Sequence, residues 1–373
     1  MKPSGKRKLT AAAQKSNGGP PTSAREFARH LIEFDSEDTA TYTPHTLPIA
    51  EVMHAFTRKP IPWPAGKQPI PKPPSPAPSA SHALPQADYV VVTWTVEEAK
   101  CLADTLTPGF PSKTSWLPYA HRFSEYVPLI RPGAPALGSN RLGSYLPTSI
   151  AGKRVLCFKS ELHMSQDGAK LPVKKLWRQL IDETQPKLVI TTGTAGGIGA
   201  SVELGDVVVA PAVRFDCTRD FKSAFFHDSV FKCSKLKTAS FAEATKLFAA
   251  NADRLPPAPR PPRIFTRATN GVPNAEVVTT DFFAYDDSLD TFHLQGLGAT
   301  VEMGDAVLGL VVDELGSSAP DWIAVRNASD PQIDATGLTQ KEVRAKAGQI
   351  YERFGYWTTI PSVIACWALI VDN

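Results

Sequence analysis

Short apolar runs alternate with helical patterns through most of the chain after residue 88. The runs are rich in Val, Ile, Leu and Thr and are nearly continuous, which is typical of strands buried on both faces of a sheet. We expect strands at 89–94, 154–160, 187–197, 206–211, 275–281, 299–303 and 322–329. Strands that alternate with amphipathic helices predict an α/β fold, in which helices cover both faces of a central sheet.

The helical patterns lie between these strands. Apolar positions recur with a period near 3.6 residues, and the expected helices are 96–106, 173–185, 304–316 and 338–355. The longest apolar run is IPSVIACWALIV at 360–371, which contains Pro361. It is shorter than the roughly 18 residues that can span a bilayer. We therefore expect it to be a buried helix, and we expect no membrane partner.

The first part of the chain has a different character. Residues 24–35 and 49–56 have helical spacing and could pack on the main domain or on a second subunit. Residues 60–86 are rich in proline, which favours extended polyproline conformation and cannot build a core. This segment is a surface strap or spacer, or a docking motif for a partner. We expect an arm over 1–87 and one domain over 88–373, with a helix-bearing insertion at about 217–270.

Composition and charge narrow the classes of function. The formal net charge is +3, from 40 basic and 37 acidic side chains, so no nucleic-acid partner is expected. The basic N-terminus lacks an apolar core and does not resemble a secretory signal, which favours the cytoplasm. Five scattered cysteines without CxxC spacing indicate free thiols, and the eight histidines form no metal-binding pattern. We expect no metal and no organic cofactor.

The most specific stretch is VITTGTAGGIGASVELGDVVVAP at 189–211. A strand opens here into a glycine turn, where missing side chains let the backbone approach a ligand closely. The turn and the following LGDVVVAP together resemble the nucleoside phosphorylase superfamily, and within it the methylthioadenosine/S-adenosylhomocysteine nucleosidases. The resemblance implies a three-layer α/β/α sandwich with a central mixed sheet of the phosphorylase/hydrolase-like kind. It also implies that Thr194, Ala195 and Gly196 face the base or the ribose.

Four further stretches resemble the same family, in the same order along the chain. They are VTWTVEEAKCLADTL, VVTTDFFA, ATVEM and VRNASDPQID. In the family, these stretches carry, in the same order, the hydrolytic glutamate, the aromatic residue that stacks on the base, the ribose-binding strand and a Ser-Asp pair. The residues so implied are Glu98, Phe283, Glu302, Met303, Ser329 and Asp330.

The chemistry of these residue types fits cleavage of an N-ribosidic bond. Such cleavage needs a proton for the leaving purine and a nucleophile on the opposite face of the sugar, as in glycoside hydrolysis. A buried carboxyl group with a raised pKa can supply the proton, and Asp330 is the candidate. Glu98 is the candidate for activating water. Phe283 can stack on the base, and an acidic group can hold the ribose hydroxyls.

Each of these residues also has a structural explanation. Thr95 and Glu98 have the T-x-x-E spacing of a helix capping box. Asp330 precedes Pro331 and could be a turn residue. Phe283 could belong to the core.

One position departs from the family pattern. Where these nucleosidases read V-E-M-E, this chain reads Val301-Glu302-Met303-Gly304, so the glutamate that would hold the ribose 2′ and 3′ hydroxyls is missing. Asp305 could reach the ribose instead, or it could simply favour the start of a helix. Alternatively, the substrate differs at the sugar or is a nucleotide, or the site binds a ligand without catalysis.

The acceptor is a separate question. In the phosphorylases of the superfamily that this chain resembles, two arginines hold the phosphate. One lies just before the glycine turn, and the other follows a Gly-Asp-Pro loop on the first strand. This chain has Thr191–Thr194 and Thr93–Val96 at these places, without arginine or Gly-Asp-Pro. Hydrolysis is therefore favoured over phosphorolysis. Lys159, His163 and Arg214 could line an extended pocket for nucleotide phosphates, or they could be ordinary surface cations.

Together these features predict a nucleosidase-like enzyme that hydrolyses the N-glycosidic bond of a purine nucleoside or nucleotide. The competing hypothesis is a non-catalytic nucleoside- or nucleotide-binding module with a degenerate ribose site. The expected partner is a small molecule. The resemblance also implies a homodimer in which the neighbour completes the pocket.

Overall fold

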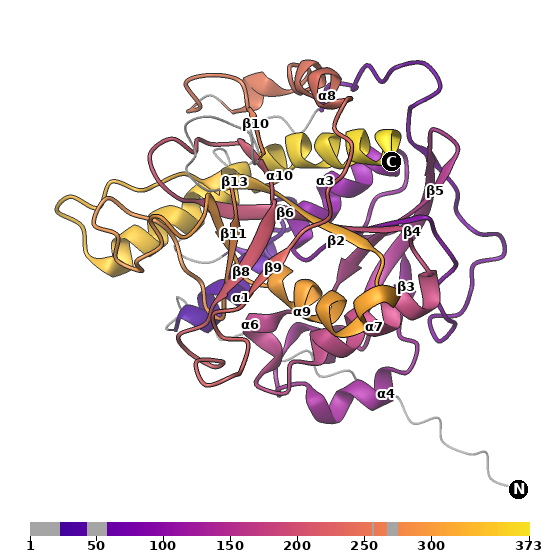
Figure 1. The fold of residues 1–373 in the computed structure, drawn as a ribbon, viewed down its shortest axis with the longest axis horizontal. Coiled ribbons are helices and arrows are strands. Elements are labelled where there is room, and N and C mark those ends of the chain that lie inside the picture. Colours follow the sequence, from indigo (N-terminus) through magenta and orange to yellow (C-terminus); the bar gives the residue numbers. More distant parts are fainter. Residues whose placement is uncertain (1–22, 43–57, 256, 267–274) are drawn as a thin grey trace, which may run out of the picture.

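A branched mixed sheet lies between two layers of helices in the computed structural model (Figure 1). The structure describes residues 23–42, 58–255, 257–266 and 275–373. One helical layer is formed by α3, α8 and α10, and the other is formed mainly by α7 and α9. The predicted α/β/α sandwich with a central mixed sheet is confirmed.

The strands fall where continuous apolar runs predict them, with several additions. They are β1 (Ile70–Pro71), β2 (Tyr89–Thr93), β3 (Leu117–Tyr119), β4 (Gly143–Ile150), β5 (Lys153–Ser160), β6 (Leu188–Gly197), β7 (Val207–Val209), β8 (Ala212–Asp216), β9 (Val230–Lys232), β10 (Ile264–Phe265), β11 (Val277–Thr280), β12 (Thr300–Glu302) and β13 (Asp321–Asp330). All seven predicted strands are present. The sequence prediction missed the other strands, β1, β3, β4, β8, β9 and β10. The longest of these are β4 and β8, whose apolar residues are interrupted by polar ones.

The centre of the sheet is β6, whose burial comes from pairing on both sides. It pairs in parallel with β2 and β13, and in antiparallel with β12. The main path runs β1-β4-β5-β2-β6-β12-β11-β8-β9, and β13 with β7 and β10 branches from β6. The ends of β2, β6 and β13 therefore meet around the glycine turn.

The helices also follow the predicted patterns. They are α1 (Ala24–Glu33), α3 (Val96–Leu106), α4 (Phe123–Tyr126), α5 (Pro135–Ser139), α6 (Met164–Asp167), α7 (Pro172–Thr184), α8 (Phe241–Phe248), α9 (Asp305–Leu315) and α10 (Gln340–Asp372), with 3-10 turns at Thr39–Thr41, Val127–Leu129, Ala252–Arg254 and Gly316–Ser318. The predicted helix at 49–56 lies outside the described residues. The segment 217–270, which we predicted to be a helix-bearing insertion, contains β9, α8 and β10 in its described part.

The C-terminal helix is longer than expected. The two predicted helices at 338–355 and 360–371 form a single helix, α10, which continues through Pro361. By length and composition α10 is the one described helix that could cross a membrane, but 94% of its most apolar window is buried inside the protein. That burial is what the core helix of a sandwich requires, because α10 packs on β6, β13 and α3.

The proline-rich segment lies along the body of the protein. Ile61 and Leu84 are buried in the main core, and Ile70 pairs with Ser149 in the short β1–β4 ladder. Trp367 of α10 donates from its indole nitrogen to the carbonyl oxygen of Lys67 at 2.7 Å. The described part of this segment is therefore a strap that the fold holds at several points.

Candidate active site

A cavity opens where β2, β6, β12 and β13 approach one another. It encloses about 640 Å³ of empty space, which includes the space at its mouth. All of the predicted site residues except Asp305 line it, although they are far apart in the sequence. These are Glu98, Thr194, Ala195, Gly196, Phe283, Glu302, Met303, Ser329 and Asp330.

Asp330 ends β13 and is buried, and among the described acids that line the cavity it is the one without a cation beside it. The Ser329 hydroxyl donates to its Oδ1 at 2.7 Å. Burial raises the pKa of Asp330 to about 7, and the hydrogen bond from Ser329 opposes this rise only in part. Asp330 can therefore be protonated near neutral pH and can give that proton to a bound group.

Glu98 has the opposite electrostatic setting. Its Oε2 accepts from the Thr93 hydroxyl and from the backbone N–H groups of Trp94 and Thr95, at 2.6, 3.0 and 2.9 Å. Its Oε1 accepts from the backbone N–H and the hydroxyl of Thr194, at 2.7 and 2.6 Å. Glu98 thus completes the capping box of α3 and also lines the cavity.

The ionised form of Glu98 is favoured. Burial alone would raise its pKa, but the positive charge of Arg326 and the hydrogen bonds from Thr194, Thr93 and Thr95 outweigh burial and lower it. Asp330 and Glu98, two of the acids that line the cavity, therefore differ in their preferred protonation states. Asp330 is poised as a proton donor, and Glu98 is a fixed carboxylate.

The glycines of the turn make room for these two carboxyl groups. A Cβ atom on Gly193 would lie 2.4 Å from Oε1 of Glu98, and one on Gly196 would lie 3.2 Å from Oδ2 of Asp330. Gly193 also has a φ of +136°, which side chains rarely adopt. Close approach at this turn is thus made by side chains of the protein itself, a role that the sequence analysis did not anticipate.

A buried group of three ionisable side chains, Glu302, Asp305 and Arg326, lies beside Asp330 and Glu98. Glu302 accepts from the backbone N–H of Asp305, at 3.0 and 3.1 Å, and it also hydrogen-bonds to the Thr279 hydroxyl. Arg326 lies 3.4 Å from Glu302 and forms a two-point ion pair with Asp305. Burial and the nearby Asp305 raise the pKa of Glu302 to about 8.

The position of Asp305 does not support its expected contact with the ribose. Its side chain is fully buried, does not line the cavity, and has both oxygens on Arg326. Asp305 is the first residue of α9, as expected if it favours the start of a helix. Its carboxylate, however, is used for the ion pair with Arg326. Glu302 is the acid of this strand that reaches the cavity.

Gly304 lies next to an aromatic wall of the cavity. A Cβ atom there would be 3.5 Å from the ring of Trp94, which is an ordinary contact. A longer side chain would have to pass this ring, over which the Arg326 guanidinium lies at 4.8 Å. Trp94 and Arg326 both line the cavity, and the sequence analysis assigned neither to the site. A bulky residue directly after a buried strand was the available signal for Trp94.

The residues considered for phosphate binding are poorly placed for it. Lys159 donates to Glu161 at 2.6 Å, and neither Lys159 nor Arg214 lines the cavity. His163 does line it, but burial lowers the pKa of His163 to about 4, so the imidazole is neutral at physiological pH. Among the described lining residues Arg326 is the one cation, and two carboxyl groups already surround it.

One wall of the cavity comes from the N-terminal arm. Ala28, Leu31 and Ile32 of α1 line it, and they face Phe283 and Tyr351. The sequence analysis also did not identify Tyr351 of α10 as a site residue, because an aromatic residue at helical spacing cannot be told from a core residue by pattern alone.

In the described part of the chain no group of three or more His, Cys, Asp or Glu side chains could hold a metal ion. All five cysteines are buried and free.

Several solved structures are similar to this chain. In fold, the chain is similar to 5′-methylthioadenosine/S-adenosylhomocysteine nucleosidase from Helicobacter pylori, solved with butyl-thio-DADMe-Immucillin-A, at 13% identity and a TM-score of 0.47, covering 77% of this chain and 99% of that one. It is also similar to futalosine hydrolase of Helicobacter pylori, at 12% identity and a TM-score of 0.46, covering 76% and 97%. A third similar structure is 5′-methylthioadenosine/S-adenosylhomocysteine nucleosidase from Neisseria meningitidis in complex with methylthio-immucillin-A. It has 15% identity and a TM-score of 0.44, and the match covers 76% of this chain and 97% of that one.

The family of the chain is shown by its sequence. The family model of the phosphorylase superfamily matches residues 124–354, which is more than half of the 373 residues. The matched region contains the glycine turn, β12 and the Ser329-Asp330 pair, whereas Glu98 and α1 lie before it. The chain therefore belongs to the phosphorylase superfamily.

Proposed function

We propose that this protein is a nucleosidase that hydrolyses the N-glycosidic bond of a purine nucleoside. The observation that carries the proposal is the pairing of two carboxyl groups with opposite protonation preferences in one cavity. Asp330 has a pKa raised to about 7, and Glu98 has a lowered pKa. Such divergence between neighbouring acids is typical of an acid and a base assigned to different steps.

In the proposed reaction Asp330 protonates the leaving purine as the bond to the sugar lengthens. Positive charge then develops on the sugar, as in other glycosyl transfers, and a water adds to the opposite face. Glu98 orients this water and accepts its proton, with the Thr194 hydroxyl as a neighbouring polar group. Glu302 holds the ribose hydroxyls, and the Phe283 ring stacks on the base.

Water is favoured as the acceptor over phosphate. A phosphate dianion needs uncompensated cations, and Arg326 already contacts Asp305 and Glu302 at the cavity. The same argument favours nucleosides over nucleotides, because Lys159 is bound to Glu161 and His163 is neutral.

A non-catalytic binding module is the second candidate, and one observation favours it. Glu98 already accepts five hydrogen bonds, so few of its lone pairs are open to a water. Binding without turnover would use the same cavity. The two candidates differ in whether a base is released.

The test is base release from adenosine, methylthioadenosine, S-adenosylhomocysteine, inosine and AMP, with and without phosphate. We expect free base and free ribose product without phosphate, with AMP the poorest substrate. Asp330→Asn should lower kcat about 10²- to 10⁴-fold, the usual contribution of a general acid. Asp313→Asn, on the exposed side of α9, is the matched control and should keep full activity.

Two outcomes would contradict the proposal. Ribose 1-phosphate formed only in the presence of phosphate would show a phosphorylase. Thermal stabilisation by these nucleosides with no base release, in wild type and in Asp330→Asn alike, would show a binding module.

A further inference from the structure

One wall of the cavity is formed by a helix that the family match does not include. The match begins at residue 124, whereas α1 spans Ala24–Glu33. Three residues of α1 nevertheless line the candidate site, and they have the i, i+3, i+4 spacing of one helix face. These are Ala28, Leu31 and Ile32, which are 1%, 5% and 5% exposed.

Helix α1 is well defined at its start. The Ser23 hydroxyl accepts from the backbone N–H of Glu26 at 3.2 Å, and the Glu26 carboxylate accepts from the backbone N–H of Ser23 at 3.0 Å. This capping box satisfies donors that a helix N-terminus otherwise leaves open. Arg25 extends the anchoring by an ion pair of 3.1 Å with Asp220.

Helix α1 is also tied to α10, which contributes Tyr351 to the cavity lining. His30 Nε2 lies 2.7 Å from Oε1 of Glu352 on α10, and both side chains are largely buried. Glu352 directly follows Tyr351, which lines the cavity, and His30 directly precedes Leu31. One turn of α1 and one turn of α10 therefore supply both lining residues of the cavity and the polar contact that holds the two helices together.

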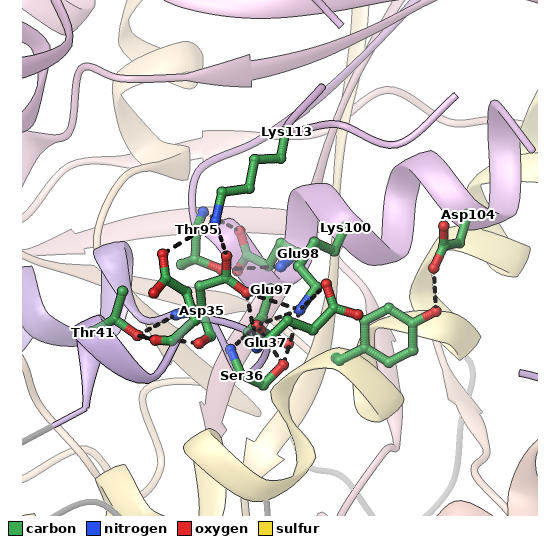
Figure 2. A network of polar contacts seen from close by, with 12 residues as sticks. Asp35, Ser36, Glu37, Thr41, Thr95, Glu97, Glu98, Lys100, Asp104 and Lys113 are labelled. Carbon is green, nitrogen blue, oxygen red and sulfur yellow. Dashed lines mark hydrogen bonds and ion pairs between the residues drawn. The ribbon is translucent and has the colours of Figure 1, made fainter. Parts of the chain in front are cut away.

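The segment after α1 is held by a second network, shown in Figure 2. The backbone N–H and the hydroxyl of Ser36 donate to Glu97 Oε1 at 2.8 and 2.9 Å. Lys100 joins this pair and binds Asp35 at 3.1 Å. Glu97 precedes Glu98, so the start of α3 both holds the arm and supplies a carboxylate to the cavity.

Helix α1 further supports the proposed stacking residue. The rings of Phe27 and Phe283 meet edge to face, with centroids 5.1 Å apart. Leu31 packs in one cluster with Phe34 and Tyr351, which Phe283 also contacts. Displacement of α1 would therefore remove one wall of the cavity and loosen another.

From these contacts we propose that α1 is the specificity wall of the site, in which Leu31 and Ile32 select the 5′ substituent of the nucleoside. This inference rests on the proposed function. Asp330 and Ser329 face the base in that function, and Glu302 and Glu98 face the ribose. The part of a nucleoside left for the apolar wall of α1 is its 5′ end. The wall then admits uncharged, apolar 5′ groups and disfavours phosphate.

The test compares Leu31→Ala, Ile32→Ala and Leu31→Phe with wild type. Substrates are adenosines that carry hydroxyl, methylthio or butylthio at the 5′ carbon, together with AMP, and kcat/KM is measured for each. Shortening Leu31 or Ile32 should raise the butylthio to methylthio ratio of kcat/KM by about tenfold or more, since a pocket discriminates about 10- to 200-fold per methylene. Leu31→Phe should shift the ratio the other way.

The matched control is Arg29→Ala, on the same helix but directed away from the cavity toward Glu33. It should leave the ratio within about twofold of wild type. Unchanged ratios in folded Leu31→Ala, Ile32→Ala and Leu31→Phe would overturn the inference. The inference would also be overturned if AMP were the best substrate of the wild-type protein.

A failure of the proposed function can be told apart from a failure of this inference. If wild type releases no base from any compound, the function is wrong, and the same ligands are then ranked by thermal shift. A ranking by 5′ group that changes in opposite directions in Leu31→Ala and Leu31→Phe would still support the wall. A ranking that all variants share with wild type, or no thermal shift in any of them, would reject it.

Discussion

Arg326, which lines the candidate site, forms a two-point ion pair with Asp305, which does not line it. Arg326 Nε donates to Asp305 Oδ2 at 2.7 Å, and a second guanidinium nitrogen donates to Oδ1. Both side chains are almost wholly buried, at 3% and 0% exposure. Buried charges in such a pair depend on each other, because neither can return to water without the protein opening.

We expect Asp305→Ala to cost about 3–5 kcal/mol of the free energy of unfolding, since it leaves a buried guanidinium without its main partner. Urea unfolding followed by circular dichroism measures this loss. Glu314→Ala, which removes the more exposed pairs with Lys174 and Arg178, should cost about 1 kcal/mol or less. An Asp305→Ala loss that matched this control would show that the buried pair is unimportant for stability.

We expect the activity to fall with rising pH because Asp330 must be protonated to act as the acid. Its pKa is about 7, so kcat/KM should fall about tenfold per pH unit above that value. Glu98 has a lowered pKa, so no acid limb is expected between about pH 5 and 7. A profile that stays level from pH 6 to 9 would exclude Asp330 as the acid.

The same pKa has a consequence for stability. The folded protein binds a proton at Asp330 up to about pH 7, whereas an unfolded aspartate releases it near its ordinary value of 3.8. The stability that wild type draws from this proton is present at low pH and is lost as pH rises toward 7, at about 1.4 kcal/mol per unit. We therefore expect Asp330→Asn to be stabilised relative to wild type more at pH 8 than at pH 5.

Melting temperatures of both proteins at the two pH values measure this difference. Comparing the two pH values removes the constant effect of the altered hydrogen bond with Ser329. An equal difference at pH 5 and pH 8 would mean that the buried carboxyl group has an ordinary pKa.

We expect Gly193→Ala to lower activity strongly, because its Cβ atom would lie 2.4 Å from the Glu98 carboxylate and the residue has a φ of +136°. Glu98 would have to leave the hydrogen bonds from Thr194, and kcat should fall more than KM changes. Gly199→Ala is the matched control, since Gly199 also has a positive φ but a Cβ atom there meets nothing within 4 Å. Equal kcat values in the two variants would argue against the crowding of Glu98.

The order of apolar runs along the chain determined the fold class and the strands of the central sheet. Continuous runs such as 89–94 and 322–329 are satisfied only by burial on both faces, so pattern alone identifies them. The motif order also identified nine residues that line the cavity. The interrupted strands β4 and β8 were missed because their burial depends on neighbours that the local pattern does not contain.

Only the tertiary structure decided what each charged side chain does. Asp305 and Glu302 look equivalent in ATVEMGD, yet Asp305 holds Arg326 with both oxygens and does not line the cavity, whereas Glu302 lies 3.4 Å from Arg326 and does line it. Likewise, nothing local to 24–35 indicates that α1 closes a site formed by strands far along the chain. Packing between distant segments decides which charged side chains pair and which residues line a cavity. The spacing of residues along one segment carries no information about that packing.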